Sequence, residues 1–232
     1  MITIRKSDER GSMDIGWLKA KYSFSFARYI DRNHMGFRAL RVLNQDLIAP
    51  DSGFDMHSHN DMEIVTYVIE GCLRHEDTLG NSSLITAGEV QRMSAGTGIT
   101  HSEYNASATD PLRLFQIWII PRAVDLKPGY EQKAIDFTAG NSDFKLLVSP
   151  DGREGSLKIN QDVRFLFARL QAGKVTGFKL NSGRHAWIQV ITGEIELNGI
   201  VLLEGDGAAI SDETSLEFKA KQAAEILLID LN

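Results

Sequence analysis

The chain has 232 residues, of which 43% are hydrophobic and 24% are charged, a composition typical of globular proteins. Its formal net charge of -6 argues against binding to nucleic-acid phosphates, because that binding depends on lysine and arginine side chains. No stretch approaches the ~20 apolar residues that cross a membrane, and the charged N-terminus lacks the apolar segment of a secretory signal. The single cysteine, Cys72, excludes an intrachain disulfide, so we expect a soluble protein of the cytoplasm.

Short β-strands, rather than helices, are predicted along most of the chain. Runs of β-branched, aromatic and aliphatic residues alternate with Gly, Asn, Asp and Ser, a pattern typical of β-sandwiches and barrels. One weak helix candidate spans Ile15 to Lys21, and residues 219–225 are expected to form a short turn or loop. Gly-Asn and Asn-Gly pairs predict hairpins at 79–83 and 197–199, because these residues tolerate positive φ angles. The clearest strand candidates are 62–69, 90–93, 112–120, 165–170, 187–191 and 225–231.

An internal repeat is visible in the two halves of the chain. In the first half YVIEG (67–71) precedes TAGE (86–89), and in the second QVITG (189–193) precedes LEGD (203–206). Each copy reads as an apolar strand, a glycine turn, a hairpin, and a second turn before the next strand. Two copies of one β-barrel unit would account for this pattern.

The repeat predicts two domains. A boundary is expected near 121–130, where PRAVDLKPGY combines two prolines with polar residues. We therefore predict an N-terminal barrel at 1–125 and a C-terminal barrel at 126–232.

Two clusters of potential metal ligands lie in the N-terminal half. His57 and His59 are two residues apart, and His101 and Glu103 repeat this spacing. Residues two apart in a strand point to the same face, so two such strands would direct four ligands into one barrel interior. Imidazole suits Fe, Ni, Cu and Zn, whereas a carboxylate favours harder ions such as Fe(II) and Mn(II). Three histidines and one glutamate leave a coordination position open, which indicates a catalytic rather than a structural site.

Other titratable residues have weaker claims to the site. Glu63 lies four residues after His59, so strand alternation would place both on one face. It is a candidate for a fifth ligand, a surface carboxylate, or a partner that orients His59, and we favour the last of these. His34, His75 and His185 have no second histidine at ligand spacing and are expected to be solvated, paired with a carboxylate, or structural.

The repeat also predicts which barrel binds metal. Aligning the two copies without gaps places Lys179 and Asn181 opposite the two histidines of the first ligand pair. It places Phe218 and Ala220 opposite the second ligand pair. None of these forms a metal site, so only the N-terminal barrel is expected to bind an ion.

The two ligand clusters resemble the paired motifs of cupins. The first motif, HxH followed by Glu and then Gly, is matched by 57–71, with the last spacing one residue longer than usual. The second motif, Gly-x2-His-x3-Asn, is matched by 98–105, although Gly96 stands where a proline is expected.

The match to the pirin family, particularly to its bacterial members, is closer and covers nearly the whole chain. One departure is Ser58, where many pirins have proline between the two histidines; it should loosen the local backbone and keep both ligands. The segments that resemble pirins, in chain order, are YSFSFARYI, MGFRALRVLNQD, HSHNDMEIVTYVIEG, QRMSAGTGITHSEYN and LFQIWIIP.

This resemblance implies an all-β bicupin: two cupin-type (jelly-roll) β-barrels, with metal in the N-terminal one only. The ligands carried over by motif are His57, His59, His101 and Glu103, and Glu63 does not match a pirin ligand. Similar bacterial pirins are associated with quercetin 2,3-dioxygenase activity, in which O2 cleaves the central ring of the flavonol and carbon monoxide is released. Eukaryotic pirins are associated with transcriptional coregulation through an iron-dependent partner interaction.

The resemblance therefore predicts a metal-dependent dioxygenase acting with O2 on quercetin or a related phenolic. One divalent ion is expected, Fe(II) first, with Ni, Mn, Co, Cu and Zn as alternatives. Glu103 would act catalytically by accepting the proton of the substrate hydroxyl. Two rival functions use the same ligands: a non-catalytic metal-dependent regulator or sensor with a protein partner, and an oxygenase of an unidentified physiological substrate. No direct contact with nucleic acid or membrane is expected, and two fused barrels are compatible with a monomer.

Overall fold

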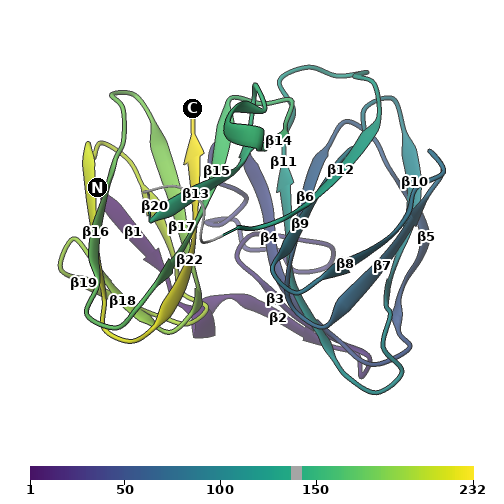
Figure 1. Cartoon of the computed structure of the whole chain (residues 1–232), viewed down its shortest axis with the longest axis horizontal. Coiled ribbons are helices and arrows are strands. Elements are labelled where there is room, and N and C mark those ends of the chain that lie inside the picture. The colour runs from purple at the N-terminus through teal and green to yellow at the C-terminus, as the bar shows by residue number, and fades with distance from the viewer. Residues whose placement is uncertain (137–142) are drawn as a thin grey trace. The chain divides into compact units, whose positions relative to one another are not determined.

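The chain folds into two compact units, each built from antiparallel β-sheets, in a computed structural model that describes residues 1–136 and 143–232 (Figure 1). The N-terminal unit comprises Gly11–Ile135 and Leu157–Gln161. The C-terminal unit comprises Met1–Arg10, Asp136–Ser156 and Asp162–Asn232. No helix among the described residues is long and apolar enough to cross a membrane.

The N-terminal unit contains a larger and a smaller antiparallel sheet. The strands of the larger sheet, in order of neighbours, are β12 (Gly129–Ala134), β9 (Glu89–Ser94), β6 (Glu63–Glu70), β11 (Leu112–Ile119), β4 (Leu40–Ile48), β3 (Leu18–Tyr22) and β2 (Gly11–Asp14). Those of the smaller sheet are β5 (Gly53–His59), β10 (Ile99–Asn105), β7 (Cys72–Asp77) and β8 (Ser82–Thr86). The short strand β14 (Leu157–Lys158) also groups with this unit.

The C-terminal unit has a matching pair of sheets. Neighbours in its larger sheet follow the order β1 (Ile2–Arg5), β20 (Gly207–Ile210), β17 (His185–Thr192), β22 (Ala224–Leu231), β15 (Val163–Leu170) and β13 (Phe144–Ser149). Its smaller sheet consists of β16 (Val175–Lys179), β21 (Ser215–Ala220), β18 (Glu194–Leu197) and β19 (Ile200–Leu203). Two short 3-10 helices, η1 (Ser7–Glu9) and η2 (Arg153–Gly155), complete the unit.

Neither unit is a single continuous segment. β1 pairs with β20, so residues 1–10 belong with the C-terminal unit. Residues 126–135 and 157–161 belong with the N-terminal unit. Both units therefore take residues from beyond the boundary predicted between 125 and 126.

The predicted internal repeat is confirmed by the strand order. Strands β5, β10, β7 and β8 correspond in order to β16, β21, β18 and β19, and β12, β9, β6, β11, β4 and β3 of the larger sheet correspond in order to β1, β20, β17, β22, β15 and β13. The repeated glycines Gly71 and Gly193 have φ angles of 84° and 81°. A side chain at either would meet the backbone that enters the next central strand, at Pro111 and Ala223 respectively. Glycine recurs here because the turn needs both a positive φ and this close approach.

The helix candidate at Ile15 to Lys21 is wrong. Residues Leu18–Tyr22 form strand β3, in which Leu18, Ala20 and Tyr22 are buried and the residues between them are not. This alternation has the period of a half-buried strand, and pairing with β4 decides the conformation. Of the turn or loop predicted at 219–225, only residues 221–223 form a bend, and the flanking residues belong to β21 and β22.

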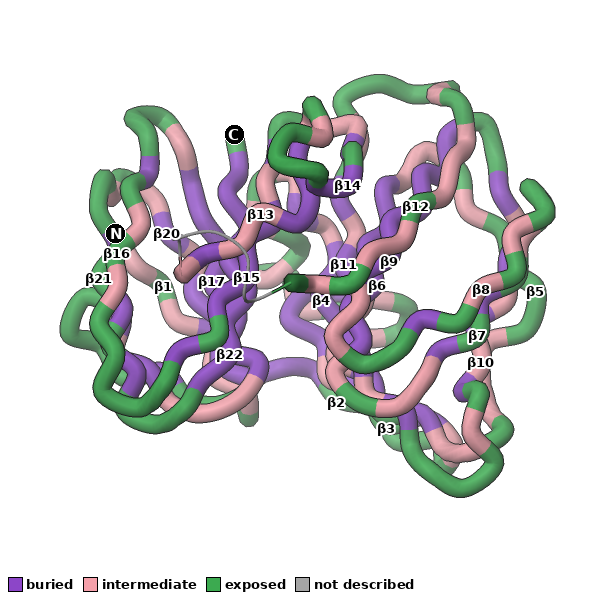
Figure 2. The backbone as a smooth tube through the Cα atoms, viewed as in Figure 1, coloured by how far each residue is buried: buried purple, intermediate pink, exposed green. Residues whose placement is uncertain are grey.

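The apolar core differs between the units. Buried residues concentrate on central strands of the larger sheets, such as β6, β17 and β22 (Figure 2). In the C-terminal unit one large hydrophobic cluster of described residues includes Ile188, Phe218 and Leu228, from both the larger and the smaller sheet. In the N-terminal unit buried residues form two separate clusters, one around Val68 and Leu114 and one around Ile64 and Met93. The interior of the N-terminal unit therefore leaves space for polar side chains.

Candidate metal centre

Two paired strands of the smaller N-terminal sheet carry the four predicted ligands. β5 carries His57 and His59, and β10 carries His101 and Glu103. Buried and partly exposed residues alternate along β10, which places both of its predicted ligands on the buried face. His57 lies opposite His101, and the register then shifts, so that Glu103 lies opposite Phe54. This irregularity of the β-bulge kind re-aims side chains within the strand pair.

The three histidines form a compact cluster. Ligand nitrogens of His57, His59 and His101 lie within 4.8 Å of one another. The ring centroids of His57 and His101 are 4.4 Å apart, and those of His59 and His101 are 5.0 Å apart. His101 is fully buried, and its Nε2 has no hydrogen-bond partner among the described residues. Because an unpaired buried nitrogen costs free energy, this atom fits a metal ligand.

The surroundings favour neutral imidazoles. Burial, assisted by the charge of His57, lowers the pKa of His59 to about 4. Burial also lowers the pKa of His101 to about 2, with the neighbouring histidines adding to the effect. In His57, Nδ1 lies 2.7 Å from the carbonyl oxygen of Asp55 and donates to it, so Nε2 is the ring nitrogen that can offer its lone pair to a metal ion. Neutral imidazole with a free nitrogen is the form that binds metal ions, so the cluster fits a metal centre.

Glu103 lies in a second group of potential ligands that shares His101 with the first. Ligand atoms of His75, His101 and Glu103 lie within 4.8 Å of one another, and all three residues are buried. The Glu103 carboxylate accepts hydrogen bonds from Gln91 Nε2 at 2.9 Å and Gln116 Nε2 at 2.7 Å. Burial raises the pKa of Glu103 to about 7, and these two bonds act in the opposite direction. The four predicted ligands thus fall into two groups that overlap at His101.

The two glutamines are not among the residues predicted from the sequence. Trp118 Nε1 donates to Gln116 Oε1 at 3.2 Å. Because an indole nitrogen only donates, the amide group of Gln116 must direct its NH2 towards Glu103. Gln116 interrupts the mainly apolar strand β11, which is a signal that the sequence does contain, whereas Gln91 lies among other polar residues of β9 and gives no such signal.

Glu63 does not have the predicted role. It is buried, but its carboxylate accepts hydrogen bonds from Ser94 Oγ at 2.8 Å and Asn160 Nδ2 at 3.0 Å rather than orienting His59. Strand alternation does not place Glu63 on the face of His59, because the two residues lie in different strands. Glu63 begins β6, after a bend in which Asp61 has a φ of 46°. Glu63 instead connects residues 157–161 to the rest of the N-terminal unit.

The remaining histidines have local partners. His34 Nδ1 lies 2.7 Å from Asp31, and His185 bonds a serine hydroxyl at 2.8 Å, which agrees with structural roles. His75 pairs with Asp77 at 3.1 Å, as one of the predicted alternatives has it. It is fully buried, so the alternative of a solvated side chain is wrong.

Aromatic side chains flank the accessible side of the cluster. His57 and His59 are partly exposed, whereas His101 is fully buried. The ring of Phe54 lies 6.3 Å from that of His57, and Trp118 packs edge-on to His59 at 5.0 Å. A flat aromatic molecule that reached the cluster from this side would contact these rings.

The corresponding positions of the C-terminal unit can be read from strand pairing. Counted from the repeated glycine, Leu197 in β18 corresponds to His75 in β7. His75 pairs with Glu103 and Leu197 pairs with Phe218, so Phe218 corresponds to Glu103. Two residues before Phe218 in β21, Leu216 corresponds to His101. Leu216 pairs with Phe178 as His101 pairs with His57, so Phe178 and Leu180 correspond to His57 and His59.

These positions correct the gap-free alignment. It is one residue out of register at Lys179 and Asn181, and two residues out at Phe218 and Ala220. The connections between strands differ in length in the two units, so counting from the glycines fails beyond the first strand. The four replacements read from strand pairing are all apolar, and in neither register do the replacements form a metal site.

Comparison with known proteins gives consistent matches over the whole chain. The model of the Pirin family matches residues 3–119, and that of the Quercetinase C-terminal cupin domain matches residues 146–231. A quercetin 2,3-dioxygenase of Escherichia coli is 46% identical over 231 residues, covering 100% of this chain and 99% of the relative. A pirin-like protein of Caulobacter vibrioides is 43% identical over 233 residues, covering 99% of each.

Solved structures agree. The crystal structure of the bacterial pirin YhhW from Escherichia coli in complex with nickel(II) has a TM-score of 0.95 and 45% identity. The match covers 100% of this chain and 99% of that one. Together with the strand order, these matches confirm the predicted all-β fold of two cupin-type barrels.

Proposed function

Because this chain belongs to the pirin family, we propose that it is a metal-dependent dioxygenase that cleaves the flavonol ring of quercetin, or of a related phenolic, with O2. The observation that carries the proposal is the cluster of His57, His59 and His101, in which the buried Nε2 of His101 lacks a partner among the described residues. Similarity to proteins named quercetin 2,3-dioxygenase supports the choice of substrate class.

The proposed ligands of one divalent ion are His57, His59, His101 and Glu103. They combine imidazole nitrogens with one carboxylate, a set that suits Fe(II) and several neighbouring metals. Fe(II) is the first ion to test, and nickel(II) follows because it is bound in the YhhW structure. When bound, the ion would supply a positive charge that favours the ionised form of a phenolic hydroxyl.

Glu103 is the proposed acceptor of the proton that the flavonol 3-hydroxyl loses. Gln91 and Gln116 each donate to one of its oxygens, at 2.9 and 2.7 Å, and so hold the carboxylate in one orientation. A carboxylate that is held in one orientation is already placed for proton transfer and loses less entropy when the proton moves. The position of Glu103 inside the barrel also keeps bulk water from its carboxylate, since the residue is buried.

The proposed binding face is the side of the cluster flanked by Phe54 and Trp118. His57 and His59 are partly exposed there, so a substrate can approach them. The two aromatic rings would pack against the flat ring system of the substrate and orient its hydroxyl towards the cluster.

The test is oxygen uptake with quercetin and a panel of other phenols, together with detection of carbon monoxide. The protein is stripped of metal and reconstituted separately with Fe, Ni, Mn, Co and Cu. His59→Ala should lose both metal and activity, whereas His34→Ala, away from the cluster, should keep both. Full metal content in His59→Ala would mean that the ligand set is wrong.

The outcome also separates the rival functions. Steady turnover of quercetin with release of carbon monoxide supports the proposal. Oxygen uptake with another phenol but not with quercetin would support the same reaction class with a different substrate. Tight metal binding without turnover on any phenol would contradict an enzyme and favour a metal-dependent regulator.

A further inference from the structure

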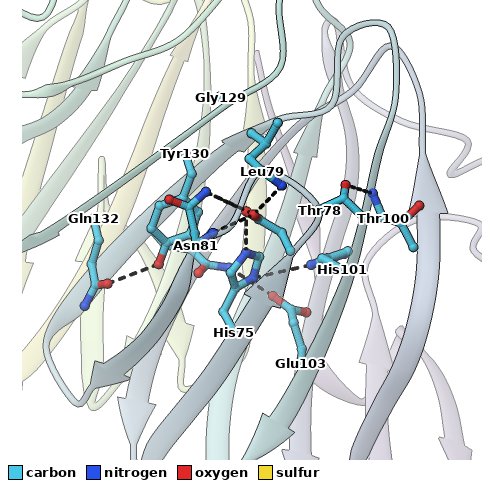
Figure 3. Close-up of polar contacts among 12 residues, drawn as sticks. His75, Thr78, Leu79, Asn81, Thr100, His101, Glu103, Gly129, Tyr130 and Gln132 are labelled. Atoms are coloured by element: carbon cyan, nitrogen blue, oxygen red, sulfur yellow. Dashed lines mark hydrogen bonds and ion pairs between the residues drawn. The ribbon is translucent and has the colours of Figure 1, made fainter.

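A fourth histidine, His75, lies behind the candidate metal centre and has no part in the proposed function. It is in the middle of β7, where it pairs across the sheet with Glu103, and it is fully buried. Figure 3 shows it next to His101, Glu103 and Tyr130. The Tyr130 ring stacks on its imidazole, with centroids 4.8 Å apart and an interplanar angle of 25°. His75 is therefore held in one position beside two of the proposed ligands.

Both ring nitrogens of His75 have partners. Nδ1 lies 3.4 Å from Nδ1 of His101, and Nε2 lies 3.1 Å from Oδ2 of Asp77. When His101 offers Nε2 to a metal ion, its ring proton is on Nδ1, which then donates to His75. His75 accepts on Nδ1, so its own proton is on Nε2 and is donated to Asp77. The contacts define one directed chain, from His101 through His75 to Asp77.

Asp77 is itself fixed by the turn that joins β7 and β8. Its Oδ1 accepts the backbone N–H groups of Leu79 and Asn81 at 2.9 and 3.0 Å. The side-chain Nδ2 of Asn81 donates to Oδ1 at 3.1 Å and to Oδ2 at 2.9 Å. The Asp77 side chain is fully buried, so water does not compete for these bonds. The far end of the chain is thus anchored by local structure.

The C-terminal unit shows that this strand position does not need histidine for folding. Leu197 corresponds to His75 there and is buried in the continuous apolar cluster. The unit that lacks the four ligands therefore also lacks the imidazole behind them. This places His75 with the chemistry of the N-terminal unit rather than with its fold.

We propose that His75 and Asp77 are positioning residues of the metal centre, which fix the tautomer and ring orientation of His101 so that its Nε2 is offered to the ion. This rests on the metal site of the proposed function. A metal-bound histidine commonly donates its second N–H to a carboxylate or carbonyl, and loss of such a partner costs about 10–100-fold in metal affinity or activity. Here a second imidazole stands between the ligand and the carboxylate. His75 is not assigned as a ligand, because both of its nitrogens already have partners.

Three variants test the chain through Co(II) binding rather than turnover. His75→Leu removes the acceptor, His75→Asn keeps an acceptor oxygen at the place of Nδ1, and Asp77→Asn removes the terminal charge. Affinity is measured by competition with a chelator, and the visible spectrum of the Co(II) protein reports ligand geometry. We expect His75→Leu to bind Co(II) about 10–100-fold more weakly with shifted bands, His75→Asn to recover most of this loss, and Asp77→Asn to fall between. The control is His34→Leu, which breaks another His–Asp pair, 2.7 Å long, in a separate loop.

Unchanged affinity and spectrum in a folded His75→Leu protein would overturn the proposal. If His75→Leu does not fold, unchanged values in His75→Asn and Asp77→Asn together with no change in the histidine tautomers by 15N NMR would overturn it instead. Loss of one of two bound Co(II) ions would also overturn it, since His75 would then be a ligand of a second site. If the wild-type protein binds no Co(II), the proposed metal centre itself is wrong. If the wild type binds Co(II) and His75→Leu binds it equally well, only the role of His75 is wrong.

Discussion

The N-terminal and C-terminal units share one strand order but fill their interiors in opposite ways. The interior of the first carries imidazole, carboxylate and amide groups, and its apolar residues are divided into separate clusters. At the corresponding positions the second unit has apolar side chains, which belong to or pack against one hydrophobic cluster. The corresponding pairs are His57 and Phe178, His59 and Leu180, His75 and Leu197, Gln91 and Ala208, His101 and Leu216, Glu103 and Phe218, and Gln116 and Leu228.

The difference separates what the fold requires from what the site requires. Both units keep the glycine at the turn into the smaller sheet, Gly71 and Gly193, because backbone geometry demands it. At the seven corresponding positions only the N-terminal unit has polar side chains, and a buried polar group needs partners, as Glu103 finds in two glutamines. Since the C-terminal unit has the same strand order with apolar side chains at these seven positions, the polar side chains of the first unit are explained by function rather than by the fold.

The largest expected effect comes from placing a ligand of the first unit into the second. Phe218→Glu puts a carboxylate into an apolar cluster that has no glutamines at the corresponding positions. We expect a loss of about 4 kcal/mol or more in the free energy of unfolding, because a buried charge without partners is strongly unfavourable. Urea unfolding measures it, with Phe218→Leu as the size control. A loss below about 1 kcal/mol would contradict the stated contrast between the interiors.

The reverse exchange should remove function and spare the fold. His101→Leu, which copies Leu216, is expected to abolish metal binding and to reduce metal-dependent turnover at least about 1,000-fold, or about 4 kcal/mol. The free energy of unfolding of the metal-free protein should change by less than about 2 kcal/mol, since the variant loses the contact of His101 with His75 and buries an apolar side chain instead. Metal analysis and urea unfolding measure the two quantities. Full metal content in this variant would mean that His101 is not a ligand.

Metal removal should act on one unit only. An ion at about 100 times its dissociation constant stabilises the state that binds it by about 2.7 kcal/mol. Chelation is therefore expected to speed hydrogen exchange in β5 and β10 and to leave β16 and β21 unchanged. Mass spectrometry of the corresponding peptides measures this, and His101→Leu, which should not respond to chelator, is the control. Equal acceleration in both units would show that metal binding is not confined to the first.

The smallest expected effect concerns the support of Glu103. Gln116→Leu, which copies Leu228, removes one of the two donors to the carboxylate. We expect metal affinity or turnover to fall about 10-fold, the lower end of the range for partners of ligands. The control is Gln171→Leu, on an exposed turn of the C-terminal unit. If both variants behave like the wild type, Gln91 alone holds Glu103.

The sequence by itself determined the features that depend on neighbours along the chain. Alternation placed His101 and Glu103 on one face of a strand, and β10 shows this pattern. The repeated glycines identified two copies of one unit, because the φ angle they need is a local property. The family motifs are equally local, and they gave the fold class and the metal hypothesis. The helix candidate at Ile15 to Lys21 failed because pairing with β4 overrides a weak local preference.

Only the tertiary structure decided which side chains surround the candidate centre. Gln91, Gln116 and His75 reach Glu103 from β9, β11 and β7, and strand pairing alone brings these strands together. Counting along the sequence from a motif does not give the correct strand partners. The register shifts between His101 and Glu103, and the connections between strands differ in length in the two units. The same holds for residues 1–10, which join the C-terminal unit through β20. Hydrogen bonds between strands join residues far apart in sequence, and their register depends on bulges and connection lengths that no single segment specifies.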